Sequence, residues 1–282
     1  MRNVDFRIDR NIVFHINYLR GQLSSNVASE PPNFDDKRSM VIDVDAAVIA
    51  ITTDNLADIL NNYVFAYPEA PITNIRISSD KGHITQTAIL HKSVPVPVQI
   101  EGEPLPTKQG AIRLRTVSVR AAGVPVKGLA DLLAIKLQDV LNLSGRGVRV
   151  EGDDLILEPN QIPLAPRFRG HVTQLRVEHN RVIEVFGNGA VDSRDRDHVP
   201  VSAPNFMYFR GGVLQFGKVS MRDADLEIVD LDPRDPFYFY LDRYNQQLVA
   251  GYSRTTKSYG LVTYMPDFNK AATTPQIGPC NK

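Results

Sequence analysis

Apolar and polar positions alternate with a period of two along most of the chain, the pattern of β-strands. In residues 40–51 the polar positions Asp43 and Asp45 give way to an unbroken apolar run from Ala46 to Ile51. This predicts a strand that begins half exposed and ends buried on both faces. In residues 112–120 the alternation slips by one residue near Val117, which predicts a β-bulge in a long curved strand.

Turn residues between alternating segments predict three hairpins. The first surrounds Gly152, the second surrounds residues 178–181, and the third places Phe209 and Val213 on either side of Gly211 and Gly212.

Two segments have helical periodicity instead. Residues 53–63 place Leu56, Ile59, Leu60 and Tyr63 on one face, with Thr52 or Thr53 as the N-cap and Asp54 in the first turn. Residues 128–141 carry a wider apolar stripe, made of Leu129, Leu132, Leu133, Leu137 and Val140. This stripe is either plain core or, in part, the lining of a cavity.

Glycine, proline and charged residues in 188–205 interrupt the pattern and indicate a linker. We therefore expect a first β-rich unit at 1–187 and a strand-rich extension at 206–268 packed on it. Residues 269–282 have the composition of a flexible tail.

Composition narrows the function classes. The 282 residues include 32 basic and 32 acidic ones, so the formal net charge is zero and a nucleic-acid partner is not expected. The one cysteine, Cys280, allows neither an internal disulfide nor a cysteine zinc site. The longest aliphatic run, Ala46 to Ile51, is far shorter than the roughly 20 residues that span a bilayer. Two locations fit: the periplasm or cell envelope, if a leader or anchor was removed, and otherwise the cytoplasm.

Chemical motifs are weak. No P-loop, dinucleotide fingerprint, zincin helix or G-x-S-x-G elbow occurs, and we predict no catalytic residue, metal ligand or cofactor. Asp225 and Glu227 alternate with apolar residues, which predicts the exposed face of a strand. The turn from Asp230 to Asp235 suits a calcium loop or an ordinary β-turn. Carboxylates of residues 223–235 also leave open a hydrolase acting on carbohydrate or lipid.

Two further groups of side chains have two interpretations each. The aromatic residues of 237–264 are either strand formers or a carbohydrate-stacking surface. Seven arginines fall largely on alternating strand positions and form either a solvated face or contacts to anionic head groups. They are Arg113, Arg115, Arg120, Arg149, Arg167, Arg169 and Arg176.

The order of these elements carries a family resemblance. A strand at 40–51 runs into the helix at 53–63, several strands follow, Gly123-Val-Pro-Val-Lys-Gly-Leu129 leads into the second helix, and Gly147 to Leu157 forms a hairpin. Over residues 4–187 this order resembles the bacterial branch of the tubular lipid-binding (TULIP) superfamily, including the LmeA-like phospholipid-binding proteins. The resemblance implies a long curved sheet around a helix with an apolar groove for acyl chains. The chain departs from the pattern in lacking a lipobox cysteine and in residues 200–282.

From these observations we expect an α+β fold, in which one long curved antiparallel sheet forms a half-barrel around two amphipathic helices. The expected function is non-catalytic binding or transfer of a lipid, a fatty-acid-like molecule or another long apolar ligand, with transient membrane contact. Side-chain direction alone selects the expected groove lining, which comprises Val48, Ala50, Leu56, Ile59, Leu60, Leu129, Leu132, Leu133, Leu137 and Val140. The alternatives are a structural scaffold protein of the cell envelope and the hydrolase described above. The pattern does not set an oligomeric state.

Overall fold

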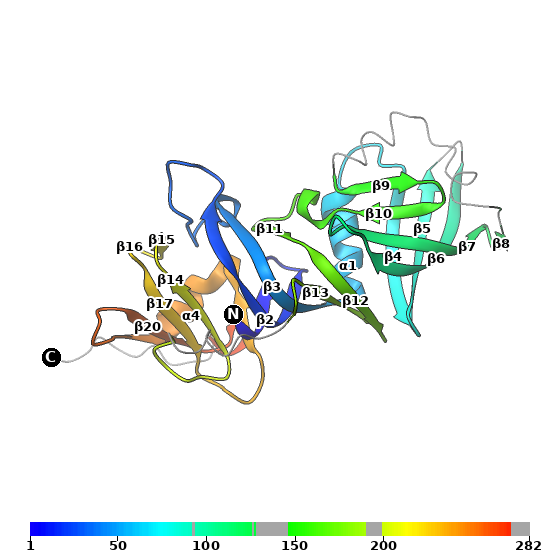
Figure 1. Cartoon of the computed structure of the whole chain (residues 1–282). Helices are drawn as coiled ribbons and strands as arrows, with labels where there is room; N and C mark the ends of the chain where they lie inside the picture. The colour runs from blue at the N-terminus through cyan, green and yellow to red at the C-terminus, as the bar shows by residue number, and fades with distance from the viewer. Residues whose placement is uncertain (92–93, 126, 128–145, 190–198, 272–282) are drawn as a thin grey trace. The chain divides into compact units, whose positions relative to one another are not determined.

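The computed structural model describes residues 1–91, 94–125, 127, 146–189 and 199–271. The chain forms two compact units: unit 1 contains residues 1–49 and 189–282, and unit 2 contains residues 50–188 (Figure 1). The fold is α+β and strongly dominated by strands, as predicted. The described strands form three sheets rather than one. No helix in the described part of the chain is long and apolar enough to cross a membrane.

Unit 1 is built on a sheet in the order β3-β2-β1-β14-β17-β20-β19, with β18 also paired to β1. Two pairings, β1 with β18 and β17 with β20, are parallel. The strands are β1 (Arg2–Arg7), β2 (Val13–Ser25), β3 (Met40–Thr52), β14 (Phe206–Arg210), β17 (Asp225–Asp230), β18 (Phe237–Tyr240), β19 (Tyr252–Thr255) and β20 (Leu261–Met265).

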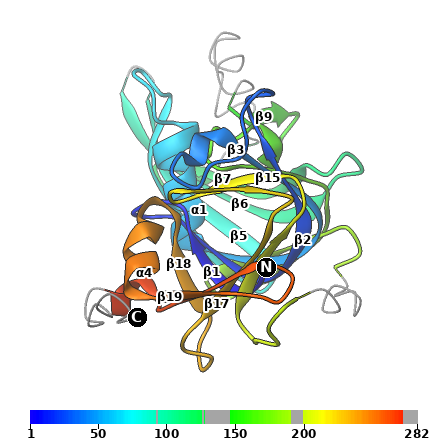
Figure 2. The same cartoon turned by 90° about the vertical axis from the view of Figure 1, so that its left-hand side faces the viewer.

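Aromatic side chains fill the core of unit 1. Phe34 packs edge-on against Phe216, Phe239 and Tyr244, with ring centroids 5.2–6.4 Å apart. Short helices accompany the sheet, with α4 beside α5 (Figure 2). They are η1 (Lys37–Ser39), η5 (Leu241–Arg243), α4 (Tyr244–Ala250) and α5 (Phe268–Ala271). Much of the aromatic cluster therefore supports the strand and core interpretation, because Phe237, Phe239 and Tyr244 are almost fully buried.

The predicted hairpin across Gly211 and Gly212 is wrong. The strand before these glycines, β14, pairs with β1 and β17. The strand after them, β15 (Val213–Phe216), pairs instead with β16 (Val219–Arg222) in a separate two-stranded sheet. Both glycines have positive φ, and Gly211 N–H donates to the Ala224 carbonyl while Ala224 N–H donates to the Gly212 carbonyl. The glycines thus start a side hairpin that leaves the sheet at residue 211 and returns at residue 224.

Unit 2 is built on a sheet in the order β4-β5-β6-β7-β10-β9, with β8 paired to β7. A further hairpin joins β12 to β13. The strands are β4 (Ile72–Asp80), β5 (His83–His91), β6 (Pro95–Pro106), β7 (Ile112–Ala121), β8 (Val124–Pro125), β9 (Val148–Glu151), β10 (Asp154–Leu157), β11 (Arg167–Gly170), β12 (Val172–Glu178) and β13 (Arg181–Phe186). A short 3₁₀ helix, η3 (Pro159–Gln161), lies between β10 and β11.

Several local predictions for residues 40–186 are confirmed. The strand at 40–51 is β3, and the hairpins at 148–157 and 175–186 are β9–β10 and β12–β13. The register between β6 and β7 shifts between Glu101 and Gly102, opposite Val117, where the alternation slips. A bulge bends a strand and increases its twist.

The first predicted helix is α1 (Thr53–Ile59), which continues in a π-helical turn, η2 (Leu60–Val64). The side chain of Thr52 accepts a hydrogen bond from Asn55 N–H at 3.2 Å and is the N-cap. Figure 1 shows α1 alongside the strands of unit 2, and α1 contacts β4 and η2. The second predicted helix, at 128–141, lies outside the described residues.

The predicted domain ranges place residues 1–49 in one unit with residues 50–187. In the structure, residues 1–49 instead form a unit with residues 189–282. The reason is strand pairing across the whole length of the chain. Arg2 of β1 pairs with Phe206 of β14, and Val4 of β1 pairs with Phe237 of β18.

Candidate functional site

A cleft of about 950 Å³ opens in unit 2. Its described lining comes from η2 and the residue that follows η2, from strands β4, β5, β6 and β7, and from the turn after β7. The residues are Asn61, Phe65, Ile72, Thr73, Asn74, Ile75, Arg76, Thr87, Ala88, Ile89, Pro97, Val98, Gln99, Arg120 and Gly123. Seven of them are apolar and seven are polar, and the latter include two arginines.

A bulge in β4 shapes one side of the cleft. The register between β4 and β5 shifts between Thr73 and Arg76, and Asn74 has a φ of 55°. The side-chain amide of Asn61 closes this irregularity, because its Nδ2 donates to the Ile75 carbonyl at 2.8 Å and its Oδ1 accepts from Ile75 N–H at 3.0 Å. The helical turn therefore satisfies the strand's backbone groups where the bulge interrupts the ladder.

Four polar lining residues stand in register across four neighbouring strands. Arg76 pairs with Thr87, Thr87 with Gln99, and Gln99 with Arg120. Directly opposed residues of an antiparallel sheet share a face, so these four side chains form one row, which we call the arginine row. The residues next to this row along β5 and β6, Ala88 and Val98, face the opposite side of the sheet. They pack in a hydrophobic cluster with Leu90 and Ile100.

A mainly apolar row runs beside the arginine row. Thr73 pairs with Ile89, and Ile89 pairs with Pro97. Each lies two or three residues from its neighbour in the arginine row, on the same face. The cleft therefore places charged and apolar groups next to each other on one surface.

The cations of this sheet divide into two sets. Arg113 donates to Asp154 at 2.9 Å and to Glu151 at 3.0 Å, and Arg115 is paired with Glu103. Arg149 likewise donates to Glu151 at 2.7 Å and to Glu158 at 3.0 Å. These hydrogen bonds from Arg149 and Arg113 lower the pKa of Glu151. Among the residues that the structure describes, Arg76 and Arg120 have no such carboxylate, and both are exposed.

The predicted groove residues occupy other places. Leu56, in α1, packs against a second core cluster formed by Ile84, Leu114 and Val182. Ile59, Leu60 and Ala50 are buried, and Val48 is half-buried in β3. None of these five is among the described residues of the cleft lining. Leu129, Leu132, Leu133, Leu137 and Val140 lie outside the described residues.

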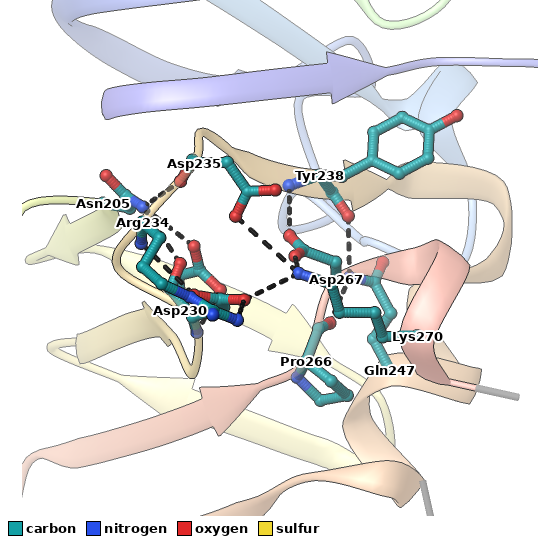
Figure 3. A network of polar contacts seen from close by, with 10 residues as sticks. Asn205, Asp230, Arg234, Asp235, Tyr238, Gln247, Pro266, Asp267 and Lys270 are labelled. Atoms are coloured by element: carbon teal, nitrogen blue, oxygen red, sulfur yellow. Dashed lines mark hydrogen bonds and ion pairs between the residues drawn. The ribbon is translucent and has the colours of Figure 1, made fainter. Parts of the chain in front are cut away.

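The acidic turn between β17 and β18 gathers three carboxylates, from Asp232, Asp235 and Asp267, with oxygens within 4.8 Å of one another. The ammonium of Lys270 already lies among them, 2.8 Å from Asp232, 2.8 Å from Asp267 and 3.7 Å from Asp235 (Figure 3). Arg234 adds a second cation 2.7 Å from Asp232. Hydrogen bonds from Arg234 and Lys270 hold the pKa of Asp232 well below its usual range.

The same region contains a network that fixes the turn to the strands. Asn205 Nδ2 donates to Asp230 at 2.9 Å and also to the Asp235 carbonyl. Asp267 Oδ1 accepts from Tyr238 N–H at 2.8 Å, and Gln247 Nε2 donates to the Pro266 carbonyl at 2.9 Å (Figure 3). Side-chain hydrogen bonds thus fix the turn to the neighbouring strands, and the ammonium of Lys270 occupies the position that a metal ion would take among the three carboxylates.

Glu227 is fully buried, so the prediction of an exposed position is wrong. Its strand, β17, lies inside the sheet between β14 and β20, and five of its six residues are buried. Burial raises the pKa of Glu227 to about 7, the charge of Asp225 adds to this, and the hydrogen bond from Val201 N–H at 2.8 Å opposes it. Its Oε1 has no partner among the described residues.

A second buried carboxyl lies in unit 2. Glu184 of β13 is paired with Leu175 and shares a face with Val182, which packs into the cluster of Ile84 and Leu114. Burial raises the pKa of Glu184 to about 7. These apolar surroundings favour the neutral carboxyl.

The cleft itself was missed by reasoning from the sequence. Its strands were expected, but the side chains of one row come from four strands spread over residues 76–120, and only their register brings them together. The sequence pattern points to Arg120 as one of seven arginines on alternating strand positions, but it does not connect Arg120 with Arg76, Thr87 or Gln99. A comparison with known protein families, curated proteins and solved structures found no match to this chain.

Proposed function

We propose that unit 2 binds a lipid, or another molecule with a long apolar part, reversibly and without covalent chemistry. The single observation that carries this proposal is the cleft of about 950 Å³ beside β4. Ligand sites generally measure roughly 300–1,000 Å³ and combine apolar walls with a few placed polar groups. The size and mixed lining of this cleft fit that description.

The apolar residues of the lining supply the affinity. Phe65, Ile89 and Pro97 offer hydrocarbon surface from the residue that follows η2, from β5 and from β6. Each methylene that such a surface takes out of water contributes about 0.8 kcal/mol. A chain of ten or so carbons would therefore bind without a dedicated clamp.

The polar lining supports binding rather than bond-making. Among the described residues that line the cleft there is no Asp, Glu, His, Cys or Ser. The groups present are amides, threonine hydroxyls and guanidinium ions, which hold and orient a ligand. The bulges in β4 and β7 favour the curved, half-barrel sheet that we propose for this unit. Transient membrane contact remains a prediction of the same proposal. So does the location, which is the periplasm or cell envelope if a leader or anchor was removed, and otherwise the cytoplasm.

A neutral ligand and one lining substitution test the proposal. We expect the full chain to bind dodecanol saturably, measured by displacement of the neutral fluorophore N-phenyl-1-naphthylamine. Ile89→Gln replaces half-buried hydrocarbon in the cleft by an amide and should weaken dodecanol about 5- to 30-fold, the equivalent of ~1–2 kcal/mol.

Thr85→Gln is the matched control. Thr85 lies on the same strand and the same face, four residues from Ile89, and outside the described lining. It should leave dodecanol affinity unchanged, with both variants melting near the parent. An absence of saturable binding, or equal affinity in Ile89→Gln and parent, would contradict the proposal and favour the scaffold alternative.

A further inference from the structure

We propose that the arginine row, made of Arg76, Thr87, Gln99 and Arg120, binds the anionic group of the ligand, a phosphate or a carboxylate. This inference rests on the proposed function, because it assigns the polar end of a ligand whose apolar part occupies the cleft.

The strand register places the two arginines at a separation that lets both side chains reach the same anion. Arg76 and Arg120 stand on β4 and β7, with Thr87 and Gln99 on the two strands between them. With about 4.8 Å between neighbouring strands, their backbones lie ~14 Å apart. Two extended arginine side chains can therefore meet over the middle of the row, above Thr87 and Gln99.

Among the residues that the structure describes, neither arginine of the row is paired with a carboxylate. On the same strand as Arg120, Arg113 and Arg115 are neutralised by Asp154, Glu151 and Glu103. In the described cleft lining, Arg76 and Arg120 are the charged residues, and both are positive. A concave surface with one sign of charge attracts the opposite ion.

The donor types fit phosphate or carboxylate. A guanidinium offers up to five N–H donors in a planar fork that matches two oxygens of either anion. The hydroxyl of Thr87 and the amide of Gln99 add donors between the two forks. The neighbouring row of Thr73, Ile89 and Pro97 would then contact the first carbons of the ligand. The arrangement selects an amphiphile over a purely apolar molecule.

Three probes of the full chain test this inference: dodecyl phosphate, dodecanol and inorganic phosphate. We expect the parent to bind dodecyl phosphate at least tenfold more tightly than dodecanol, with an advantage that shrinks as salt rises. The double variant Arg76→Gln with Arg120→Gln should lose this preference and bind dodecyl phosphate and dodecanol with equal affinity.

Arg115→Gln is the matched control, because Arg115 is an exposed arginine on the same strand, paired with Glu103. It should keep the preference. Equal parent affinities for dodecyl phosphate and dodecanol, or a preference that survives in the double variant, would overturn the inference.

Inorganic phosphate separates this inference from the proposed function. If it binds as tightly as dodecyl phosphate in the parent and not in the double variant, the row holds a free phosphate compound. The inference about the row then stands and the proposed lipid function fails. If dodecanol binds, but dodecyl phosphate and inorganic phosphate each bind the parent and the double variant with equal affinity, the proposed function stands and the inference fails.

Discussion

Glu227 is a carboxyl buried where the alternating pattern predicts an exposed one. It lies at 0% exposure in β17, with Oε2 held by Val201 N–H and Asp225 two residues away. A carboxylate in such surroundings is costly, so the neutral acid is favoured and the pKa rises to about 7. Alternation distinguishes the two faces of a strand, but it does not show that both faces are covered.

The raised pKa of Glu227 makes the stability of unit 1 depend on pH. The folded state holds its proton more tightly than the unfolded state, whose pKa is near the ordinary 4.5. The contribution to stability is complete below about pH 4.5 and is lost as the pH rises through about 7. Glu227→Gln keeps the acceptor for Val201 and cannot ionise. It should be more stable than the parent at pH 8, by about 1–3 kcal/mol, and should unfold in urea with less change between pH 5 and 8.

Glu30→Gln, at an exposed glutamate of the same unit, serves as the control and should follow the parent. Tyrosine fluorescence and circular dichroism report unfolding, because the chain has no tryptophan. If the free energy of unfolding changed with pH in the same way for Glu227→Gln and the parent, the pKa of Glu227 would not differ between the folded and unfolded states.

At the scale of elements, ion pairs join the turn between β17 and β18 to α5. Lys270 extends from α5 to the carboxylates of Asp232 and Asp267, and Asp267 is only 2% exposed and also accepts from Tyr238 N–H. The sequence leaves a calcium loop and a plain turn open for residues 230–235. The lysine that decides between them lies 35 residues after Asp235, where no local pattern connects it to the turn.

Lys270→Gln should destabilise unit 1 by about 1–3 kcal/mol, because it leaves the buried carboxylate of Asp267 without its cation. Calcium chloride should not raise the melting temperature of the parent above that in sodium chloride of equal ionic strength, because the ammonium occupies the centre of the cluster. Differential scanning calorimetry measures both effects.

The exposed Lys257, also in unit 1, provides the control Lys257→Gln, which should melt like the parent. A calcium-dependent rise in the parent, or a Lys270→Gln variant as stable as Lys257→Gln, would contradict this description of the turn.

Local signals predicted elements well where the determinants lie within a few residues. The N-cap Thr52 starts α1, and the slip near Val117 marks the bulge of β7. The bulge of β4 depends on Asn61, more than ten residues away. Gly211 and Gly212 form a turn as expected, but the partners of the strands on either side are set by long-range pairing. This is why strand existence was predictable and the Gly211–Gly212 hairpin was not.

At the scale of the whole molecule, the chain leaves unit 1 within β3, builds unit 2, and returns to unit 1 after residue 188. No composition change marks the first boundary, because the unbroken apolar run of β3 from Ala46 to Ile51 continues through it. The described lining of the candidate cleft belongs to unit 2 and falls in residues 61–123. The fold class was predictable from alternation, whereas the cleft arises from register between strands and was not.

The most direct test of ligand binding by unit 2 is native mass spectrometry of the full chain purified without detergent, followed by organic extraction. We predict a stoichiometric adduct whose extract contains a molecule with a long apolar part, and loss of this adduct in Ile89→Gln but not in Thr85→Gln. A clean mass of the chain alone, with no uptake from added phospholipid, fatty acid or dodecanol, would contradict the proposal that unit 2 is a lipid-binding unit.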